Sequence, residues 1–489
     1  MSKSESGLGL KDASLLRSQA YVAQGWRAAA SGDTFPVSNP ATGQELTQVA
    51  SLCADEVQAA IAGAVQAQRQ WAARTAADRA RLLHAWHDLI LQNADDLARL
   101  MTLEQGKPLA ESLGEVKYAA SFIEWFAEEG KRTYGDVIPA PAPDKRLVTI
   151  KQPVGVCAAI TPWNFPAAMI TRKAGPALAA GCAMIVKPAE DTPLTALALA
   201  VLAERAGIPA GVLQVVTGDA REIGAVLTAS PDIRKLSFTG STEVGRLLMA
   251  QSAPTIKRLS LELGGNAPFI VFDDADLDAA VEGAMASKYR NSGQTCVCAN
   301  RLLVQAGVYD AFVEKLRDKV AALKVGDGTQ DGVQQGPLIN RDALDHALEL
   351  IEDARAQGAQ VVIGGEAHAL GGTFFQPTIL SQLNLNMRVA HEEIFAPVAP
   401  VFKFETEAQA IEQANDTEYG LAAYLFTRDI GRAWRVGEAL EYGMVGLNTG
   451  MISNEVAPFG GIKQSGLGRE GSHLGIDEYL EVKYLCLQV

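Results

Sequence analysis

The first third of the chain carries apolar residues three and four positions apart, after a polar, turn-rich start over residues 1–50. This spacing predicts amphipathic helices at 54–71, 77–100 and 112–132. The last of these contains an aromatic stripe, Phe122, Trp125 and Phe126, which we interpret as core. A proline-rich segment at 139–143 then predicts a linker.

Beyond the linker the pattern changes to that of strands. Residues 146–152 alternate between apolar and polar side chains, as a strand does when one face is exposed. Continuous apolar runs follow at 154–160, 183–186, 212–216 and 236–238, separated by helical patterns at 167–180, 193–206 and 220–230. Buried strands that alternate with helices predict βαβ units and a parallel sheet covered on both faces.

A second alternating region runs from residue 267 to about 450. It contains helical patterns at 277–289, 308–322 and 342–357 and a short apolar strand at 360–363. The last residues, 476–487, alternate again. The chain therefore predicts an α/β protein of more than one domain, with two or three expected for 489 residues.

Charge and composition indicate a globular protein and argue against some classes of binding partner. Hydrophobic residues make up 48% of the chain, enough to bury sizeable cores. The net charge of −14 argues against nucleic acid and anionic membranes as partners. The longest apolar stretch, 174–186, is short and is broken by glycine and proline, so we expect no membrane span.

The six cysteines are spread thinly, and the six histidines form no cluster with them. We therefore expect neither a disulfide framework nor a bound metal, and a reducing compartment. The first residues lack the charged start and apolar run of a secretion signal, and Glu5 and Asp12 argue against a transit peptide. A cytoplasmic location follows as the expectation.

Cys296 is the candidate nucleophile. It lies in a polar, glycine-bearing stretch, 288–301, that also contains Lys288, Arg290 and Arg301. Only a thiolate is nucleophilic, and positive charge close by favours that form. The alternative is an inert cysteine that behaves as a small hydrophobic residue.

Two further residues suit the chemistry of a cysteine that attacks a carbonyl. Glu262 stands among apolar neighbours, and a carboxylate partly removed from water has the raised pKa that suits a general base. The alternative is a solvated loop acid. Asn164, between Trp163 and Phe165, offers amide donors for an oxyanion, with a buried structural asparagine as the alternative.

Phosphate and ribose candidates lie at the predicted strand ends. Residues 240–245 follow an apolar strand and open a helical run, where backbone N–H groups hold phosphate. The alternative is an ordinary helix cap. Lys187 and Glu190 follow the strand 183–186, with a surface turn as the alternative. Residues 466–471 match the dinucleotide spacing, but no strand precedes them and no helix follows, so we interpret them as a flexible loop.

Four segments, 162–166, 238–245, 261–266 and 392–397, together with the Cys296 segment, resemble the aldehyde dehydrogenase superfamily in order and over nearly the whole chain. The similarity is greatest to the succinate-semialdehyde dehydrogenases. It implies a Rossmann-like parallel-sheet cofactor domain at 1–131 and 152–261, and an α/β catalytic domain at 262–470. It also implies a small β oligomerisation extension at 132–151 and 471–489, hence a homo-oligomer, either a dimer or a tetramer.

The resemblance also implies a reaction. Cys296 attacks an aldehyde, Asn164 and the Cys296 backbone N–H hold the oxyanion, hydride leaves for NAD or NADP, and Glu262 activates water to release the acid. The implied cofactor-binding residues are Ile160, Thr161, Pro162, Trp163, Lys187, Glu190, Gly218, Phe238, Gly240, Ser241, Leu263, Glu393 and Phe395. Glu190 favours NAD, because a carboxylate accepts ribose hydroxyls and repels a 2′-phosphate. Ala396 departs from the glycine of many relatives.

The implied substrate is a short aldehyde with a carboxylate at its far end, succinate semialdehyde above all. Arg172, Arg290 and Ser453 are the candidates for binding that carboxylate. Taken alone, each arginine could instead pair with an acidic neighbour on a helix surface. Glutarate semialdehyde or a broader range of aldehydes are the alternative substrates.

Cys298 is a candidate for a reversible disulfide with Cys296, and a packed thiol is the alternative. Three other functions compete with the dehydrogenase. A thiol hydrolase would need a histidine base, and a non-catalytic binding protein would not need Cys296, Glu262 and Asn164 together. Enzymes that form acyl-CoA typically lack the glutamate found here at Glu262.

Overall fold

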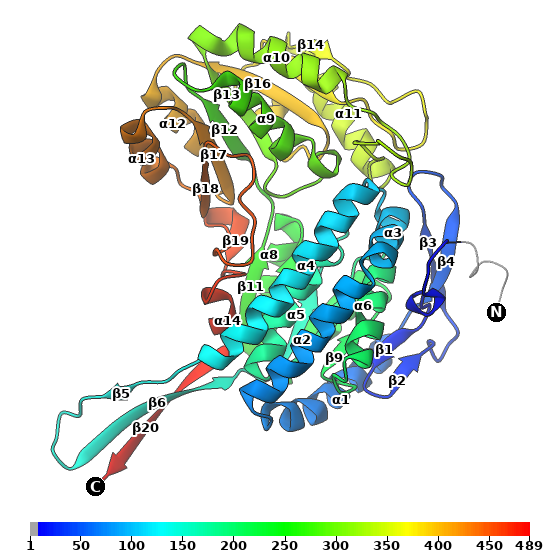
Figure 1. The fold of residues 1–489 in the computed structure, drawn as a ribbon, viewed down its shortest axis with the longest axis vertical. Coiled ribbons are helices and arrows are strands. Elements are labelled where there is room, and N and C mark those ends of the chain that lie inside the picture. The colour runs from blue at the N-terminus through cyan, green and yellow to red at the C-terminus, as the bar shows by residue number, and fades with distance from the viewer. Residues whose placement is uncertain (1–7) are drawn as a thin grey trace.

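The computed structural model describes residues 8–489. Figure 1 shows two α/β lobes, one above the other, and a long β arm that leaves the lower lobe. The fold is therefore the α/β architecture that the alternation of apolar runs and helical patterns predicts. None of the described helices has the length and apolar character needed to cross a membrane.

The lower lobe contains an eight-stranded sheet in the order β19-β11-β10-β7-β8-β9-β1-β2. The five strands from β11 to β9 are parallel, and the strands at the two edges are antiparallel to their neighbours. Their bounds are β1 (Ala20–Val22), β2 (Gly25–Arg27), β7 (Val156–Ile160), β8 (Ala183–Lys187), β9 (Leu213–Val215), β10 (Ile233–Thr239), β11 (Arg258–Glu262) and β19 (Gly466–Leu467). The central strands are almost wholly buried, as continuous apolar runs require.

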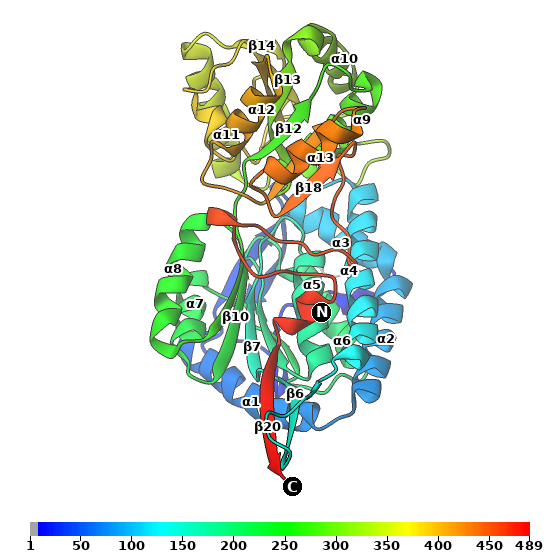
Figure 2. The same ribbon diagram turned by 90° about the vertical axis from the view of Figure 1, so that its left-hand side faces the viewer.

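Helices cover both faces of this sheet. Figure 2 shows α7 and α8 on one side and α2, α4, α5 and α6 on the other. The bounds are α1 (Ala54–Ala72), α2 (Ala76–Gln92), α3 (Ala94–Gln105), α4 (Leu109–Glu129), α5 (Ala168–Ala180), α6 (Pro193–Arg205), α7 (Ala220–Ala229) and α8 (Thr242–Ser252). Phe122 and Phe126 of the aromatic stripe are fully buried in the core under α4, as predicted, and Trp125 packs against that core.

The single helix predicted at 77–100 is wrong, because α2 and α3 are separate. Asn93 ends one and precedes the other with non-helical backbone angles (φ −107°, ψ 20°), and its side-chain amide donates to the Leu89 carbonyl at 2.8 Å. Apolar spacing continues across this break because both helices pack against the same core. Periodicity alone therefore does not reveal the break.

The upper lobe contains a seven-stranded sheet in the order β14-β15-β16-β13-β12-β17-β18, parallel except for β14. The strands are β12 (Ala267–Val271), β13 (Ala299–Gln305), β14 (Gln360–Ile363), β15 (Thr378–Ser381), β16 (Val398–Phe404), β17 (Ala422–Phe426) and β18 (Met444–Leu447). The helices are α9 (Leu277–Lys288), α10 (Tyr309–Ala321), α11 (Arg341–Ala356), α12 (Glu407–Asn415) and α13 (Ile430–Ala439). The sequence analysis did not identify α12 and α13.

The arm is a three-stranded sheet of β5 (Val137–Ile138), β6 (Lys145–Pro153) and β20 (Leu480–Gln488), with β20 at one edge. Strands β6 and β20 pair antiparallel from Leu480–Pro153 to Gln488–Lys145. The proline-rich segment links β5 to β6, and a short helix, α14 (Leu474–Asp477), precedes β20. A separate hairpin, β3 (Thr34–Ser38) with β4 (Glu45–Ala50), lies beside the lower lobe.

The chain passes from the lower to the upper lobe between β11 and β12, and it returns between β18 and β19. The first crossing follows the carboxyl end of a parallel strand, where open α/β sheets hold their ligands. The site described next lies at this crossing.

Candidate active site

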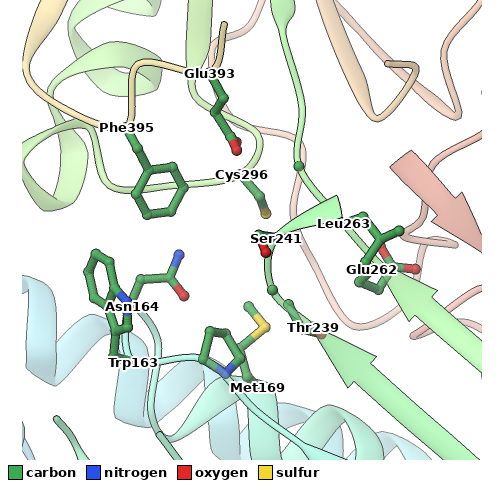
Figure 3. Close-up of a pocket in the computed structure, with 13 residues that line it drawn as sticks. Trp163, Asn164, Met169, Thr239, Ser241, Glu262, Leu263, Cys296, Glu393 and Phe395 are labelled. Carbon is green, nitrogen blue, oxygen red and sulfur yellow. The ribbon is translucent and has the colours of Figure 1, made fainter. Parts of the chain in front are cut away.

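A cavity of about 270 Å³ lies between the lobes, and Figure 3 shows its lining. Three turns that follow lower-lobe strands form one side: 162–164 after β7, 239–241 at the end of β10, and 262–264 at the end of β11. Cys296, Glu393 and Phe395 from the upper lobe form the other side. The two lobes thus bring together the candidate nucleophile, base and oxyanion residue.

Cys296 lies in the loop before β13 and is partly exposed to this cavity. Burial raises the pKa of its thiol to about 12, and the charge of Glu393 acts in the same direction. The Arg172 and Arg290 guanidinium groups oppose this shift but do not overcome it. The thiol is therefore protonated near neutral pH and needs a base to become a nucleophile.

Two of the three cations expected to activate Cys296 serve other groups. The Lys288 ammonium is buried without a hydrogen-bond partner among the described residues, and its charge acts to lower the pKa of Cys298, not that of Cys296. Arg301 points into the core and donates to the carbonyls of Asn266 (3.0 Å), Gln413 (2.6 Å) and Ala414 (2.8 Å). The prediction that flanking cations lower the pKa of Cys296 is wrong for these two residues, because proximity in sequence does not fix side-chain direction.

Glu262 is the last residue of β11 and is 4% exposed, so it is not a solvated loop acid. Both carboxylate oxygens are buried without a hydrogen-bond partner among the described residues. Burial first, and then the charge of Glu470, raise the pKa of Glu262 well above its usual range. In Figure 3 this carboxylate points away from Cys296. It lies against Gly460, where an added Cβ would come within 2.9 Å of Oε1.

Asn164 lies in the turn between β7 and α5 and lines the cavity with Cys296. Its Nδ2 donates to the Gln294 carbonyl at 3.0 Å, which uses one of its two N–H bonds. Its Oδ1 is buried and has no partner among the described residues. The amide therefore keeps one donor that can serve an oxyanion.

The cofactor candidates form two groups. Pro162, Trp163, Gly240, Ser241, Leu263, Glu393 and Phe395 line the cavity. Ile160, Thr161, Lys187, Glu190, Gly218 and Phe238 lie outside it, at or just beyond the ends of β7, β8, β9 and β10. Apart from Glu393 and Phe395, which face them from the upper lobe, both groups follow the carboxyl edge of the lower sheet, so a single extended ligand can contact both.

The local geometry fits a dinucleotide. Ser241 caps α8 by accepting from the Val244 N–H at 3.3 Å, which leaves the other N–H groups of the first turn for phosphate. An added Cβ at Gly240 would lie 2.4 Å from the Phe238 ring, so a side chain does not fit there. The Thr161 hydroxyl is buried and unpartnered among the described residues.

Charged and aromatic groups complete this edge. Lys187 is buried, and its Nζ lies 2.8 Å from the Glu190 carboxylate, which is 41% exposed. Glu393 accepts from the Gly265 N–H at 3.2 Å, and burial raises the pKa of Glu393 to about 7. Phe395 meets Trp163 edge-on, with ring centroids 5.6 Å apart. Ala396, beside it, is fully buried.

A smaller cavity of about 20 Å³ joins the three substrate candidates to the nucleophile. It is lined by Tyr118, Phe165, Met169, Arg172, Arg290, Thr295, Cys296, Val297, Ser453 and Phe459. Its walls are largely apolar, and the two guanidinium groups are its cations. A third cavity, of about 290 Å³, shares Tyr118, Phe165, Arg290 and Ser453 with it and extends outward.

The two arginines differ in their surroundings. Arg172 is 1% exposed, pairs with Glu470 at 2.5 Å and stacks on the Phe459 ring at 4.0 Å, yet its Nη2 has no partner among the described residues. Arg290 lies 5.3 Å from the Phe165 ring and forms no ion pair within the described part of the chain. Neither arginine is engaged in a pair on an exposed helix surface.

Comparison with known proteins decides the family. The model of the aldehyde dehydrogenase family matches residues 26–485. The chain belongs to this family. It is 64% identical to a glutarate-semialdehyde dehydrogenase of Pseudomonas aeruginosa and 64% identical to an NADP⁺ succinate-semialdehyde dehydrogenase of Escherichia coli. Each match covers 98% of this chain and 99% of the relative.

A solved structure confirms the fold. The crystal structure of succinate-semialdehyde dehydrogenase from Burkholderia pseudomallei is 63% identical and superimposes with a TM-score of 0.98, over 98% of this chain and 100% of that one. The α/β aldehyde dehydrogenase fold predicted from the sequence is therefore correct. The predicted domain boundaries stay a prediction, although β19 pairs with β11 and so joins the lower sheet.

Sequence reasoning missed several residues of this aldehyde dehydrogenase site. Glu470 belongs to the segment interpreted as a flexible loop, yet it is buried and binds both Arg172 and Lys173. Met169 lines the main cavity. Lys107 and Asn291 contact Asn164 directly. Only tertiary contacts reveal these roles, because no sequence motif links the segments.

Cys298 is buried, with Sγ directed at the Lys288 carbonyl rather than into the cavity that Cys296 lines. A disulfide between the two stays a prediction that needs this side chain to turn. No group of three His, Cys, Asp or Glu side chains that could hold a metal occurs within residues 8–489.

Proposed function

We propose that this protein oxidises succinate semialdehyde to succinate with NAD as the hydride acceptor, through a thioester on Cys296. One observation carries the substrate assignment: Arg172, Arg290 and Ser453 line the same small cavity as the candidate nucleophile. The names of relatives at 64% identity, which act on semialdehydes, support the same assignment.

The lining that this small cavity shares with the neighbouring cavity of about 290 Å³ suits an aldehyde with a carboxylate at its far end. Arg290 offers a guanidinium group without a carboxylate partner among the described residues, and Arg172 offers the unpartnered Nη2. Charge-assisted bonds from guanidinium to carboxylate are short and strong, and apolar walls strengthen them further. The Ser453 hydroxyl supplies a third donor. A neutral aldehyde of the same length would leave these donors unpaired.

The chain's own residues account for the two halves of the reaction. Once the Cys296 thiol has lost its proton to solvent, Sγ bonds to the aldehyde carbon, and the carbonyl electrons move to oxygen, where the Asn164 amide and the Cys296 backbone N–H donate to the resulting oxyanion. As the oxyanion re-forms the carbonyl, hydride leaves the adduct carbon and a thioester remains. NAD, when bound, would supply the hydride acceptor. Water attacks the thioester carbon, the C–S bond breaks, and the acid leaves.

Glu262 is the proposed base for that water. Burial raises the pKa of Glu262, which makes its carboxylate a stronger proton acceptor than a solvated one. Because its carboxylate lies against Gly460, it must rotate towards Cys296 to act on a thioester there. No histidine lines the main cavity within the described residues, which disfavours a thiol hydrolase with a histidine base.

Glutarate semialdehyde is the second candidate substrate. It differs by one methylene, which is worth only ~1–3 kcal/mol of discrimination in an apolar pocket. The Pseudomonas aeruginosa relative is named for it. The same arginine pair would serve either substrate, so the relative kcat/KM of the two decides between them.

The proposal also covers the preferred cofactor, the assembly and the location of the enzyme. We infer that Glu190 makes NAD the preferred cofactor, although the Escherichia coli relative is named for NADP⁺. The arm joins subunits into a dimer or tetramer, and the enzyme works in the cytoplasm without a membrane or nucleic-acid partner.

Succinate semialdehyde and butanal, which lacks the carboxylate, test the substrate assignment. The parent should prefer the semialdehyde in kcat/KM, and Arg290→Ala should reduce that preference about 10- to 100-fold, as loss of a charged hydrogen bond predicts. Arg81→Ala, an exposed arginine on α2, should leave it unchanged. Equal use of butanal by the parent would mean a broad aldehyde dehydrogenase instead.

A further inference from the structure

The two donors of the proposed oxyanion site come from different lobes. Asn164 follows β7 of the lower sheet, whereas Cys296 precedes β13 of the upper sheet. A misplacement of about 1 Å between such groups costs on the order of 100-fold in rate. Some contact must therefore fix one segment against the other.

Asn291, in the short helix Arg290–Gly293 just before Cys296, makes that contact. Its Nδ2 donates to the Asn164 main-chain carbonyl at 3.0 Å and to the Gln294 carbonyl at 3.3 Å. The Asn164 side chain donates to the same Gln294 carbonyl at 3.0 Å. Asn164 is thus held through both its main chain and its side chain to the segment that carries the nucleophile.

The lower lobe supports Asn291 from behind. Gln105, at the end of α3, donates from Nε2 to Asn291 Oδ1 at 3.1 Å, and Glu111 accepts the Asn291 backbone N–H at 2.8 Å. The Asn291 side-chain amide and backbone N–H that make these contacts are buried, since the residue is 1% exposed. Its orientation is therefore fixed from two directions.

Lys107 holds the Asn164 turn on its other side. Its Nζ donates to the Asn164 carbonyl at 2.6 Å and pairs with Glu115 at 2.6 Å, and both side chains of this pair are 1% exposed. Glu115 in turn accepts the backbone N–H groups of Ala167 (2.9 Å) and Ala168 (3.2 Å). One buried ion pair thus binds both ends of the turn that presents Asn164.

The backbone at Asn291 explains why an asparagine serves here. Its φ of 50° and ψ of 38° lie in the left-handed region, which asparagine tolerates better than most residues with a side chain. Ser292 shares this conformation, with φ 53°. Its hydroxyl, however, bonds to Gly336 and makes no contact with Asn164. Substitutions at Asn291 and Ser292 can therefore distinguish the effect of the left-handed backbone from the effect of the hydrogen bond between the Asn291 amide and Asn164.

We propose that Asn291 and Lys107 are positioning residues that fix the Asn164 amide relative to Cys296, an inference that rests on the proposed dehydrogenase function. Neither lines the main cavity, so they act through Asn164 and not on the substrate. Loss of either should slow the steps that pass through the oxyanion, leaving binding nearly intact.

The test compares Asn291→Gly with Ser292→Gly, because glycine adopts the left-handed backbone at both positions. Pre-steady-state NADH formation from succinate semialdehyde is recorded for each. Asn291→Gly should slow the burst about 10- to 100-fold while KM for the aldehyde and NAD binding by equilibrium dialysis change less than about threefold. Ser292→Gly should stay within about threefold of the parent.

A double-mutant cycle with Asn164→Ala separates positioning from general damage. Loss of an oxyanion donor costs about 100- to 1,000-fold by itself. In that background Asn291→Gly should slow the burst by less than about twofold further, because there is no amide left to position. If Asn291→Gly does not fold, Lys107→Met is measured in the same cycle, with Lys117→Met, exposed on α4, as its control.

Two results would overturn the positioning role. One is that Asn291→Gly and Ser292→Gly slow the NADH burst equally. The other is that the effects of Asn291→Gly and Asn164→Ala on the burst rate are independent in the double variant. A parent that forms NADH in a burst keeps the proposed function intact in either case. A parent without any NADH formation overturns the proposed function and this inference with it.

Discussion

Cys296 shares its cavity with two carboxyl groups, Glu262 and Glu393. Burial raises the pKa of the thiol, and the charges of both carboxylates raise it further. A group whose acidic form is stabilised in this way loses its proton only at higher pH. Nucleophilicity in the ligand-free protein is therefore limited by deprotonation, despite the exposure of the sulfur to the cavity.

Alkylation of Cys296 by iodoacetamide measures this directly. Because its pKa is raised to about 12, the rate should rise about tenfold per pH unit from pH 7 to pH 10 without a plateau. Free cysteine, with a pKa of about 8.5, should level off within that range. Peptide mass spectrometry identifies the modified residue. A plateau for Cys296 below pH 9 would show that the thiol is activated before any ligand binds.

The sequence predicted the surroundings of some site residues correctly and those of others wrongly. The apolar neighbours of Glu262 correctly indicated a buried acid, because both faces of a parallel sheet are covered and successive side chains on either face are buried. Lys288 and Arg301 gave a wrong expectation, because the charge of Lys288 acts on Cys298 and the Arg301 guanidinium donates to backbone carbonyls. The direction of a charged side chain, and not its distance along the sequence, decides which groups its charge affects.

At the scale of elements, the carboxyl ends of β7, β8, β10 and β11 supply most of the site. This was predictable for β7, β8 and β10, since each apolar run ends at a polar or glycine-bearing turn and parallel strands end at one edge. The sequence analysis did not identify β11. The break between α2 and α3 was not predictable from periodicity, because one core covers both helices. Nor was the pairing of β19 with β11, because its partner is about 200 residues away.

Glu190, three residues beyond Lys187 at the end of β8, gives an element-scale prediction. Glu190→Ser removes a carboxylate that accepts ribose hydroxyls and repels a 2′-phosphate, so the ratio of kcat/KM for NADP over NAD should rise at least about tenfold. It also frees Lys187, whose Nζ lies 2.8 Å from Glu190, to attract that phosphate. Glu124→Ser, exposed on α4, is the control. An unchanged ratio would remove Glu190 from cofactor selection.

At the scale of the whole molecule, the site exists only where the two lobes meet. Arg172 comes from α5, Arg290 follows α9, and Glu470 belongs to a segment near the carboxyl end. The sequence analysis located Arg172 and Arg290 but not Glu470, and the resemblance to a family supplied the order of the motifs. The buried pair between Arg172 and Glu470 was unforeseen because nothing local in either segment requires it.

The arm provides a prediction about assembly. Val482, Tyr484 and Leu487 of β20 are each more than half exposed, and an apolar edge strand of this kind favours pairing with another chain. The parent should therefore form dimers or tetramers, and Val482→Lys with Tyr484→Lys should shift the mass by light scattering towards the monomer. Gln48→Lys, exposed on β4, should have no effect. An unchanged mass in the double variant would place the subunit contacts elsewhere.

The most direct test of the whole account is a single-turnover measurement on Glu262→Gln with succinate semialdehyde and NAD. Both carboxylate oxygens of Glu262 lack a hydrogen-bond partner within residues 8–489, and its proposed task comes only after hydride transfer. The account predicts one equivalent of NADH per active site in a burst and then a stall, with intact-protein mass spectrometry showing a succinyl group on Cys296. Loss of the burst together with the steady state, or parental turnover without any acyl adduct, would contradict it.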